Sequence, residues 1–79
     1  RWDRSQLTGH ELKGRTLGIV GLGRIGSEVA VRAAAFGMEL VGHDPYVGDE
    51  RFRGLRVTRL PSLDALLEAS DVVTIHTPL

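Results

Sequence analysis

Short apolar runs alternate along this chain with stretches in which apolar residues recur at helical spacing. Thr16–Val20 is an apolar run that ends at a glycine, and its length and ending predict a buried strand. Residues 24–36 are predicted to form a helix, because alanines fill the positions between the apolar residues and Gly37 suits a C-terminal cap. The apolar residues at helical spacing are Ile25, Val29, Ala33 and Phe36.

The remaining runs predict three further strands. Met38–His43 lies between the helix cap and an Asp-Pro break, and Val72–Ile75 is rich in β-branched residues, so each is expected to be a strand. Pro45–Gly54 holds two glycines, a proline and several charges, which is typical of a loop. Leu55–Thr58 is then expected to form a short strand.

A second helix is predicted to begin after Pro61, with Ser62 as N-cap and Asp64 in its first turn. Its buried face is expected to consist of Leu63, Leu66 and Leu67. The predicted order is therefore strand, helix, strand, short strand, helix, strand. Because parallel strands need crossover connections, this alternation predicts an α/β fold with a parallel sheet and helices on its faces.

The strongest chemical signal is Gly21–Gly26, which reads Gly-Leu-Gly-Arg-Ile-Gly and lies between a predicted strand and a predicted helix. In a dinucleotide-binding loop of this pattern, Gly21 would allow the tight turn, Gly23 the approach of a pyrophosphate, and Gly26 the packing of helix on strand. The alternative is a glycine-rich turn that binds no ligand.

Two further features bear on the same site. The N–H groups near Arg24 and Ile25, at the start of the predicted helix, are expected to hold phosphates. Asp44 follows the glycine motif at close to the spacing of about 20 residues expected of a ribose-binding acid. Its charge would repel a 2′-phosphate, which favours NAD, although Arg51 and Arg53 in the next loop leave NADP open. A simple Asp-Pro turn is the alternative interpretation of Asp44.

Residues at the end of the last predicted strand complete the candidate site. His76, Thr77 and Pro78 lie where an open α/β sheet binds its ligands, and Thr77 would reach the crevice if the last strand neighbours the first. His76 has no visible acid–base partner, so a structural hydrogen bond is its alternative role. The histidines lack metal-ligand spacing, and His10 and His43 carry no motif, so we assign no metal ligand and no catalytic residue.

Composition limits the partners. The 79 residues are 42% hydrophobic, and ten Lys plus Arg balance ten Asp plus Glu, so neither a nucleic acid nor a membrane surface is expected to bind. The absence of cysteine suits a reducing compartment, and we expect a cytoplasmic protein. A start at Arg1 and an end at Leu79 predict an internal piece of a longer chain. We expect Arg51, Arg53, Arg56 and Arg59 to form a solvated loop surface.

Five stretches covering nearly the whole chain are more specific than the glycine motif alone. They are Gly9–Gly14 (GHELKG), Thr16–Gly26 (TLGIVGLGRIG), Ala34–Met38 (AAFGM), His43–Tyr46 (HDPY) and Ser70–Leu79 (SDVVTIHTPL). Together they resemble the NAD-dependent D-2-hydroxyacid dehydrogenases, most closely the D-3-phosphoglycerate dehydrogenase branch of that family. The resemblance implies that residues 1–14 enter a Rossmann-type domain and that residues 15–79 form its first half.

The resemblance also implies an activity and contacts. The activity is hydride transfer between NAD(H) and a 2-hydroxy or 2-oxo acid, such as D-3-phosphoglycerate, in a homodimer or larger assembly. The family's catalytic histidine, glutamate and substrate-binding arginine match no position of this chain. By resemblance, Arg24 and Ile25 contact the pyrophosphate, Asp44 the adenosine ribose, and Thr77 the cofactor near the middle of the crevice.

Three alternatives to a D-2-hydroxyacid dehydrogenase remain at this point. One is an NAD(H)-sensing corepressor of the C-terminal-binding type, although such proteins typically depart from the His-Thr-Pro-Leu ending that this chain keeps. Another is an NAD-binding module without chemistry. Formate dehydrogenases, the third, share the fold and much of the glycine loop.

Overall fold

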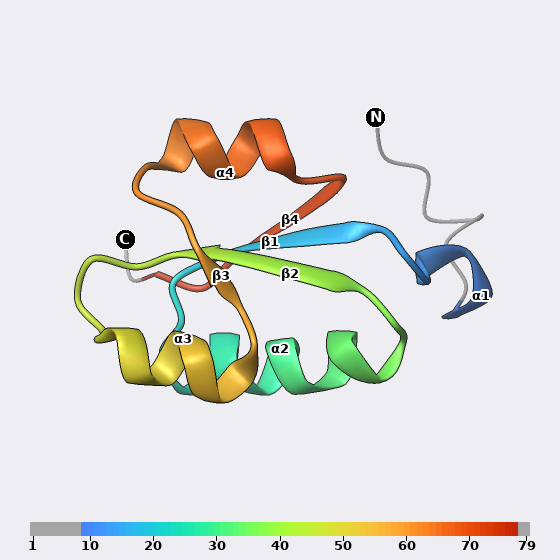
Figure 1. Ribbon diagram of the computed structural model, residues 1–79, viewed down its shortest axis with the longest axis horizontal. Coiled ribbons are helices and arrows are strands. Elements are labelled where there is room, and N and C mark those ends of the chain that lie inside the picture. Colours follow the sequence, from blue (N-terminus) through green and yellow to red (C-terminus); the bar gives the residue numbers. More distant parts are fainter. Residues whose placement is uncertain (1–8, 78–79) are drawn as a thin grey trace.

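The computed structural model describes residues 9–77, which form one parallel sheet with helices on both faces (Figure 1). The strands are β1 (Thr16–Val20), β2 (Glu39–His43), β3 (Thr58–Arg59) and β4 (Val72–Ile75). The helices are α1 (Gly9–Leu12), α2 (Arg24–Ala35), α3 (Asp49–Leu55) and α4 (Leu63–Ala69). All strand pairs are parallel and the order is β3-β2-β1-β4, which confirms the predicted α/β fold and the place of the last strand beside the first.

The sheet is the middle of three layers. Helix α4 covers one face, and α2 and α3 cover the other (Figure 1). The second of these interfaces holds the main core, built from β1, β2, α2, α3 and the loops between them. On the opposite face Gly18 lets α4 lie close to β1, because a Cβ there would be 2.7 Å from Leu66 Cδ2. The main core residues are Leu17, Ile19, Leu22, Ala30, Ala33, Leu40, Phe52 and Val57.

Both predicted helix starts are correct. Helix α2 begins at Arg24, and it ends at a C-cap on Phe36 before Gly37, whose φ of 81° needs a glycine. Helix α4 follows Ser62, whose hydroxyl accepts a hydrogen bond from the Ala65 N–H at 3.1 Å. Helix caps depend on neighbouring residues alone, so the sequence was enough to predict them.

The predicted loop over Pro45–Gly54 is confirmed for residues 45–48 and wrong for the rest, because Asp49–Leu55 forms α3. Gly48 is the N-cap, so it lies at the helix boundary, and the acidic first turn complements the helix dipole. Phe52, at 2% exposure, anchors the helix in the core. Burial of one aromatic ring thus outweighs the poor local propensity of this segment.

The third strand also differs from its prediction over Leu55–Thr58. Leu55 ends α3, and Arg56 turns the chain in the left-handed region with φ 58°, so the strand starts only at Thr58. Thr58 and Arg59 then pair with β2.

Some predicted buried positions are wrong as well. On α4 only Leu66 is buried, whereas Leu63 and Leu67 are exposed. For α2 no buried face was predicted: its buried residues are small, namely Gly26, Ala30 and Ala33, while Ile25 on the helix and Phe36 at its C-cap are exposed. Apolar periodicity marked the right elements, but their contact faces are narrower than the periodicity indicated.

Within residues 9–77, no helix has both the length and the apolar character that crossing a membrane requires.

Candidate functional site

The candidate site depends on three strand ends that finish level with one another. In the parallel register, Val20 of β1 lies beside His43 of β2 and Ile75 of β4. The main-chain pairing continues one step further, since the Gly21 N–H donates to the His43 carbonyl at 3.0 Å. The residues that follow the three strands and so come together are Gly21, Asp44 and His76.

A pocket of about 540 Å³ opens at this edge of the sheet. Its lining consists of Gly21, Gly23, Asp44, Tyr46, Val47, His76 and Thr77. The structure therefore brings five of the predicted site residues into one pocket, from three separate stretches of sequence. Sequence reasoning missed Tyr46 and Val47, although Tyr46 belongs to the His-Asp-Pro-Tyr stretch that was already noted for its resemblance.

The structural roles predicted for two glycines are confirmed. Gly21 has φ 92°, and a Cβ there would lie 2.8 Å from the Thr77 methyl carbon. A Cβ on Gly26 would fall on the Gly21 carbonyl oxygen, so α2 packs directly against the turn. Gly23 has no heavy atom within 4 Å of where its Cβ would be, which leaves its backbone open at the pocket.

The first turn of α2 carries no negative charge of its own. It has no acidic residue, and the N-cap of the helix, Gly23, offers no side-chain acceptor. Each of the other described helices, α1, α3 and α4, has an acidic residue in its first turn. The first N–H groups of a helix have no acceptor inside it, so an anion at α2 would meet open donors and the positive end of the dipole.

Asp44 is buried, at 8% exposure, and it has a structural role in addition to any ligand. Its Oδ2 accepts the Leu22 N–H at 2.7 Å, and its Oδ1 accepts the Tyr46 N–H at 2.8 Å. Asp44 therefore does shape the turn, as the alternative interpretation held. A carboxylate has about four acceptor positions, so about two remain for a ligand at the pocket that Asp44 lines.

The histidine at the pocket has a local partner. His76 Nε2 and the Thr74 hydroxyl share a hydrogen bond of 2.7 Å, which fits the structural role offered as its alternative. His43 lies behind the site, where its Nδ1–H donates to the Leu60 carbonyl at 3.1 Å.

Among residues 9–77 there is no group of three or more His, Cys, Asp or Glu side chains that could hold a metal ion.

The other predicted site residues are not among those that line this pocket. Arg24 lines a separate pocket between α2 and α3, Ile25 is exposed, and Gly26 is buried behind the turn. Pro78 lies outside the described residues.

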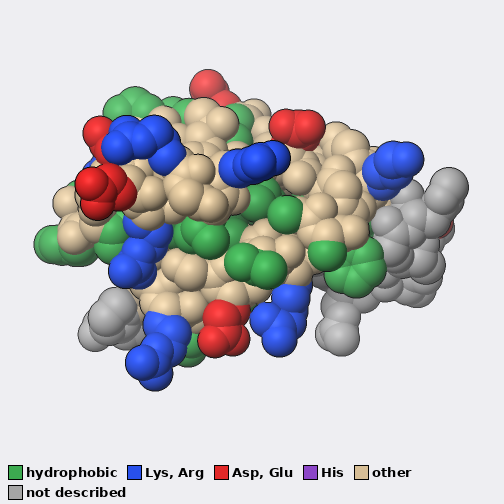
Figure 2. Space-filling view, turned by 60° about the horizontal axis from the view of Figure 1, so that its bottom comes forward, with side chains coloured by type: hydrophobic (Ala, Val, Ile, Leu, Met, Phe, Trp, Pro, Cys, Tyr) green, Lys and Arg blue, Asp and Glu red, His purple; other side chains and the backbone are tan. Residues whose placement is uncertain are grey.

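All four arginines of the expected solvated surface are exposed, and two of them also make specific contacts. Arg51 Nη1 donates to the Leu22 carbonyl at 3.1 Å. Arg59 pairs with Asp49 at 2.8 Å, donates to the Asp44 carbonyl at 3.0 Å and stacks over the Phe52 ring at 4.6 Å. Figure 2, with the α2–α3 side turned forward, shows Lys and Arg interspersed with Asp and Glu on this face.

A parallel sheet whose first strand turns through a glycine loop into a helix, with an acid at the end of the second strand, defines a Rossmann-type dinucleotide-binding fold. The sequence model of one protein family, described as the D-isomer specific 2-hydroxyacid dehydrogenase, NAD binding domain, matches residues 1–79 of this chain. The chain belongs to this family of NAD-binding domains.

Relatives and solved structures agree with that assignment. D-3-phosphoglycerate dehydrogenase of Rattus norvegicus is 51% identical over the whole chain, and that of Bacillus subtilis is 50% identical over 99% of it. The chain spans 15% of the length of each. These relatives give the corepressor alternative no support.

Holo D-mandelate dehydrogenase of Rhodotorula graminis has a TM-score of 0.80 at 39% identity, over 89% of this chain and 21% of that one. D-lactate dehydrogenase of Lactobacillus jensenii with NAD+ has a TM-score of 0.71 at 32% identity, over 82% and 19%. Both neighbours are dehydrogenases of D-2-hydroxy acids by name, so sequence and structure identify the same class.

Substitutions at the second and third glycines of the loop, Gly23 and Gly26, are expected to differ in their effect on stability. Gly26→Ala is expected to lower the melting temperature, because the new methyl group would fall on the Gly21 carbonyl, at a cost of about 1–3 kcal/mol. Gly23→Ala is expected to leave it nearly unchanged, since its φ of −81° suits any residue and the space is open. Thermal unfolding of both variants checks this, and equal losses would contradict it.

Proposed function

We propose that this chain forms the adenosine and pyrophosphate side of the NAD site in a dehydrogenase of D-2-hydroxy acids. The observation that carries the proposal is a single pocket that holds the open Gly23 backbone and the Asp44 carboxylate side by side, next to an α2 N-terminus without acidic residues. An anionic group and a pair of hydroxyls at adjoining positions are what an ADP-ribosyl group presents. The residues present therefore fit the cofactor that the family binds.

Each predicted site residue has a defined task in this proposal. The main-chain N–H groups of Gly23, Arg24 and Ile25 hold the pyrophosphate without needing a charged side chain. Asp44 accepts the adenosine ribose hydroxyls with the acceptor positions that Leu22 and Tyr46 leave free. Gly21, His76 and Thr77 form walls of the pocket that receives the cofactor, and Gly26 lets α2 pack against the turn beneath it. Pro78, which lies outside the described residues, is proposed as a further cofactor contact.

The cofactor supplies the hydride acceptor, and this chain's residues bind and orient its adenosine end. The chain spans 15% of the relatives' length, so we place the acid–base and substrate-carboxylate groups elsewhere in the complete protein. Residues 15–79 would form the first part of the nucleotide domain, with residues 1–14 leading into it. We propose that the complete protein acts on D-3-phosphoglycerate or a related D-2-hydroxy acid, the substrate class in the names of the relatives. We further propose, from the family resemblance and the absence of cysteine, a cytoplasmic homodimer or larger assembly.

The complete protein is expected to reduce NAD+ with D-2-hydroxy acids and not with their L-isomers. Absorbance at 340 nm, with D-3-phosphoglycerate, D-lactate and D-mandelate each tested beside its L-isomer, measures the activity and ranks the substrates. Tight NAD+ binding without turnover of any of these acids would favour a sensor over an enzyme.

Gly23→Val is expected to weaken NAD+ binding by about tenfold or more, because the side chain obstructs charge-assisted hydrogen bonds between the loop and the pyrophosphate. Gly48→Val is the matched control: Gly48 is also an extended N-cap glycine with no heavy atom near its Cβ position, but it caps α3. Isothermal titration calorimetry compares the two variants. Equal affinity in Gly23→Val and wild type would remove the pyrophosphate from this loop.

The complete protein is expected to bind NAD+ more tightly than NADP+, because the Asp44 carboxylate would repel a 2′-phosphate. Arg51 and Arg59, two of the four arginines nearby, already donate to main-chain carbonyls. Asp44→Asn should reduce the preference for NAD+, measured as the ratio of the two affinities. The ratio is the right measure because the substitution also changes the turn, which affects the binding of both cofactors alike. Titration showing tighter binding of NADP+ to wild type would contradict the assignment.

A further inference from the structure

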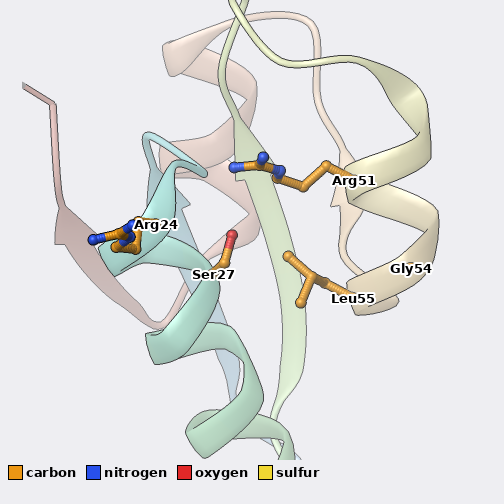
Figure 3. Close-up of a pocket in the computed structure, with 5 residues that line it drawn as sticks. All are labelled: Arg24, Ser27, Arg51, Gly54 and Leu55. Carbon is orange, nitrogen blue, oxygen red and sulfur yellow. The ribbon is translucent and has the colours of Figure 1, made fainter.

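A second pocket, of about 520 Å³, lies between α2 and α3 and shares no lining residue with the pocket at the strand ends. Figure 3 shows Arg51 extending from α3 toward α2, where the Ser27 side chain lies. Both side chains donate to the same acceptor, the carbonyl of Leu22. The pocket is lined by Arg24, Ser27, Arg51, Gly54 and Leu55.

Leu22 lies between the first two glycines of the loop, and its carbonyl, its N–H and its side chain are each fixed by contacts. Its carbonyl accepts from Arg51 Nη1 at 3.1 Å and from the Ser27 hydroxyl at 3.4 Å. Its N–H donates to Asp44 at 2.7 Å. Its side chain is fully buried, at 0% exposure. Groups on α2, on α3 and at the end of β2 thus fix one residue of the glycine loop.

The direction of the Leu22 carbonyl also determines that of the next N–H. A trans peptide unit is planar, so its C=O and N–H point in opposite directions. Holding the Leu22 carbonyl toward Arg51 therefore directs the Gly23 N–H away from Arg51. Gly23 lines the strand-end pocket and Arg51 the other one, so the two ends of this peptide unit lie toward different pockets.

Without these contacts the peptide unit would have little to restrain it. Gly21 and Gly23 stand on either side of Leu22, and glycine rotates about φ and ψ with few steric barriers. When a loop becomes ordered only on binding, the conformational entropy it loses makes the free energy of binding less favourable. A donor that fixes the Leu22 carbonyl beforehand removes part of that cost.

We propose that Arg51 is a positioning residue for the cofactor, which fixes the Leu22–Gly23 peptide so that the Gly23 N–H faces the pyrophosphate. It acts through the Leu22 carbonyl, without contacting the phosphates. The inference rests on the proposed function of the glycine loop. Arg59 supports the arrangement, because it bonds both the Asp44 carbonyl and the Asp49 carboxylate and so holds the start of α3 to the end of β2.

The test compares Arg51→Met with Arg53→Met in the complete protein. Both variants remove one positive charge from α3, but the Arg53 side chain makes no hydrogen bond or ion pair within residues 9–77. Arg51→Met is expected to raise the Kd and KM for NAD+ about three- to tenfold, the effect of one hydrogen bond, and to leave kcat unchanged. Adenosine, which lacks the pyrophosphate, should bind both variants as well as it binds wild type.

Two further measurements are the salt dependence of NAD+ binding and the effect of a second variant, Ser27→Ala. The loss in Arg51→Met should be the same at low and high ionic strength, because a contact through the backbone is not an attraction between charges. Ser27→Ala, which removes the longer bond to the same carbonyl, should weaken NAD+ binding in the same direction and by less. If Arg51→Met fails to fold, the NAD+ affinity of Ser27→Ala is compared with that of wild type instead.

The outcomes separate this inference from the proposed function. Wild-type protein that does not bind NAD+ would overturn both. Wild-type protein that binds NAD+, with Arg51→Met or its substitute Ser27→Ala equal to it, would overturn only the role of the carbonyl contact. A parallel loss of adenosine affinity, or a loss that disappears at high salt, would also overturn it, in favour of general support of the domain or of direct charge attraction.

Discussion

The level ending of three parallel strands is the constraint on which the site depends. Val20 lies beside both His43 and Ile75, so the residues that follow them emerge at one edge of the sheet. The glycine loop, the acid at the end of β2 and the threonine after β4 come from distant stretches of sequence, and this register alone brings them into one pocket. A slip by one residue would turn alternate side chains to the opposite face and separate these groups.

Asp44 links the architecture to binding. Its carboxylate is the only buried charged group among the described residues, and each of its oxygens accepts a main-chain N–H, one from the glycine loop and one from the turn after β2. Such charge-assisted bonds contribute about 1.5–3 kcal/mol, which offsets the cost of burying the charge. The group proposed to bind ribose therefore also orders the loop proposed to bind pyrophosphate, so both parts of the site are set before a ligand arrives.

The two well-placed arginines act in the same way, as directed donors. Arg51 and Arg59 bond carbonyls of the loops they face, whereas Arg32 makes an exposed ion pair with Glu28 at 3.9 Å. Exposed pairs of that kind contribute about 0–1 kcal/mol. The Arg59 guanidinium stacks on Phe52, so the same aromatic ring that anchors α3 in the core also orients this donor.

The sequence by itself determined the elements whose signals are local: the glycine motif after β1, the Ser62 cap, the β-branched β4 and the acid after β2. These follow from backbone freedom, capping and short-range packing, which depend on neighbouring residues. Only the tertiary structure decided that residues 49–55 are helical, because Phe52 gains its stability from a core that spacing does not reveal. It also decided which leucines of α4 are buried and which arginines find carbonyls, since those depend on contacts between elements far apart in the chain.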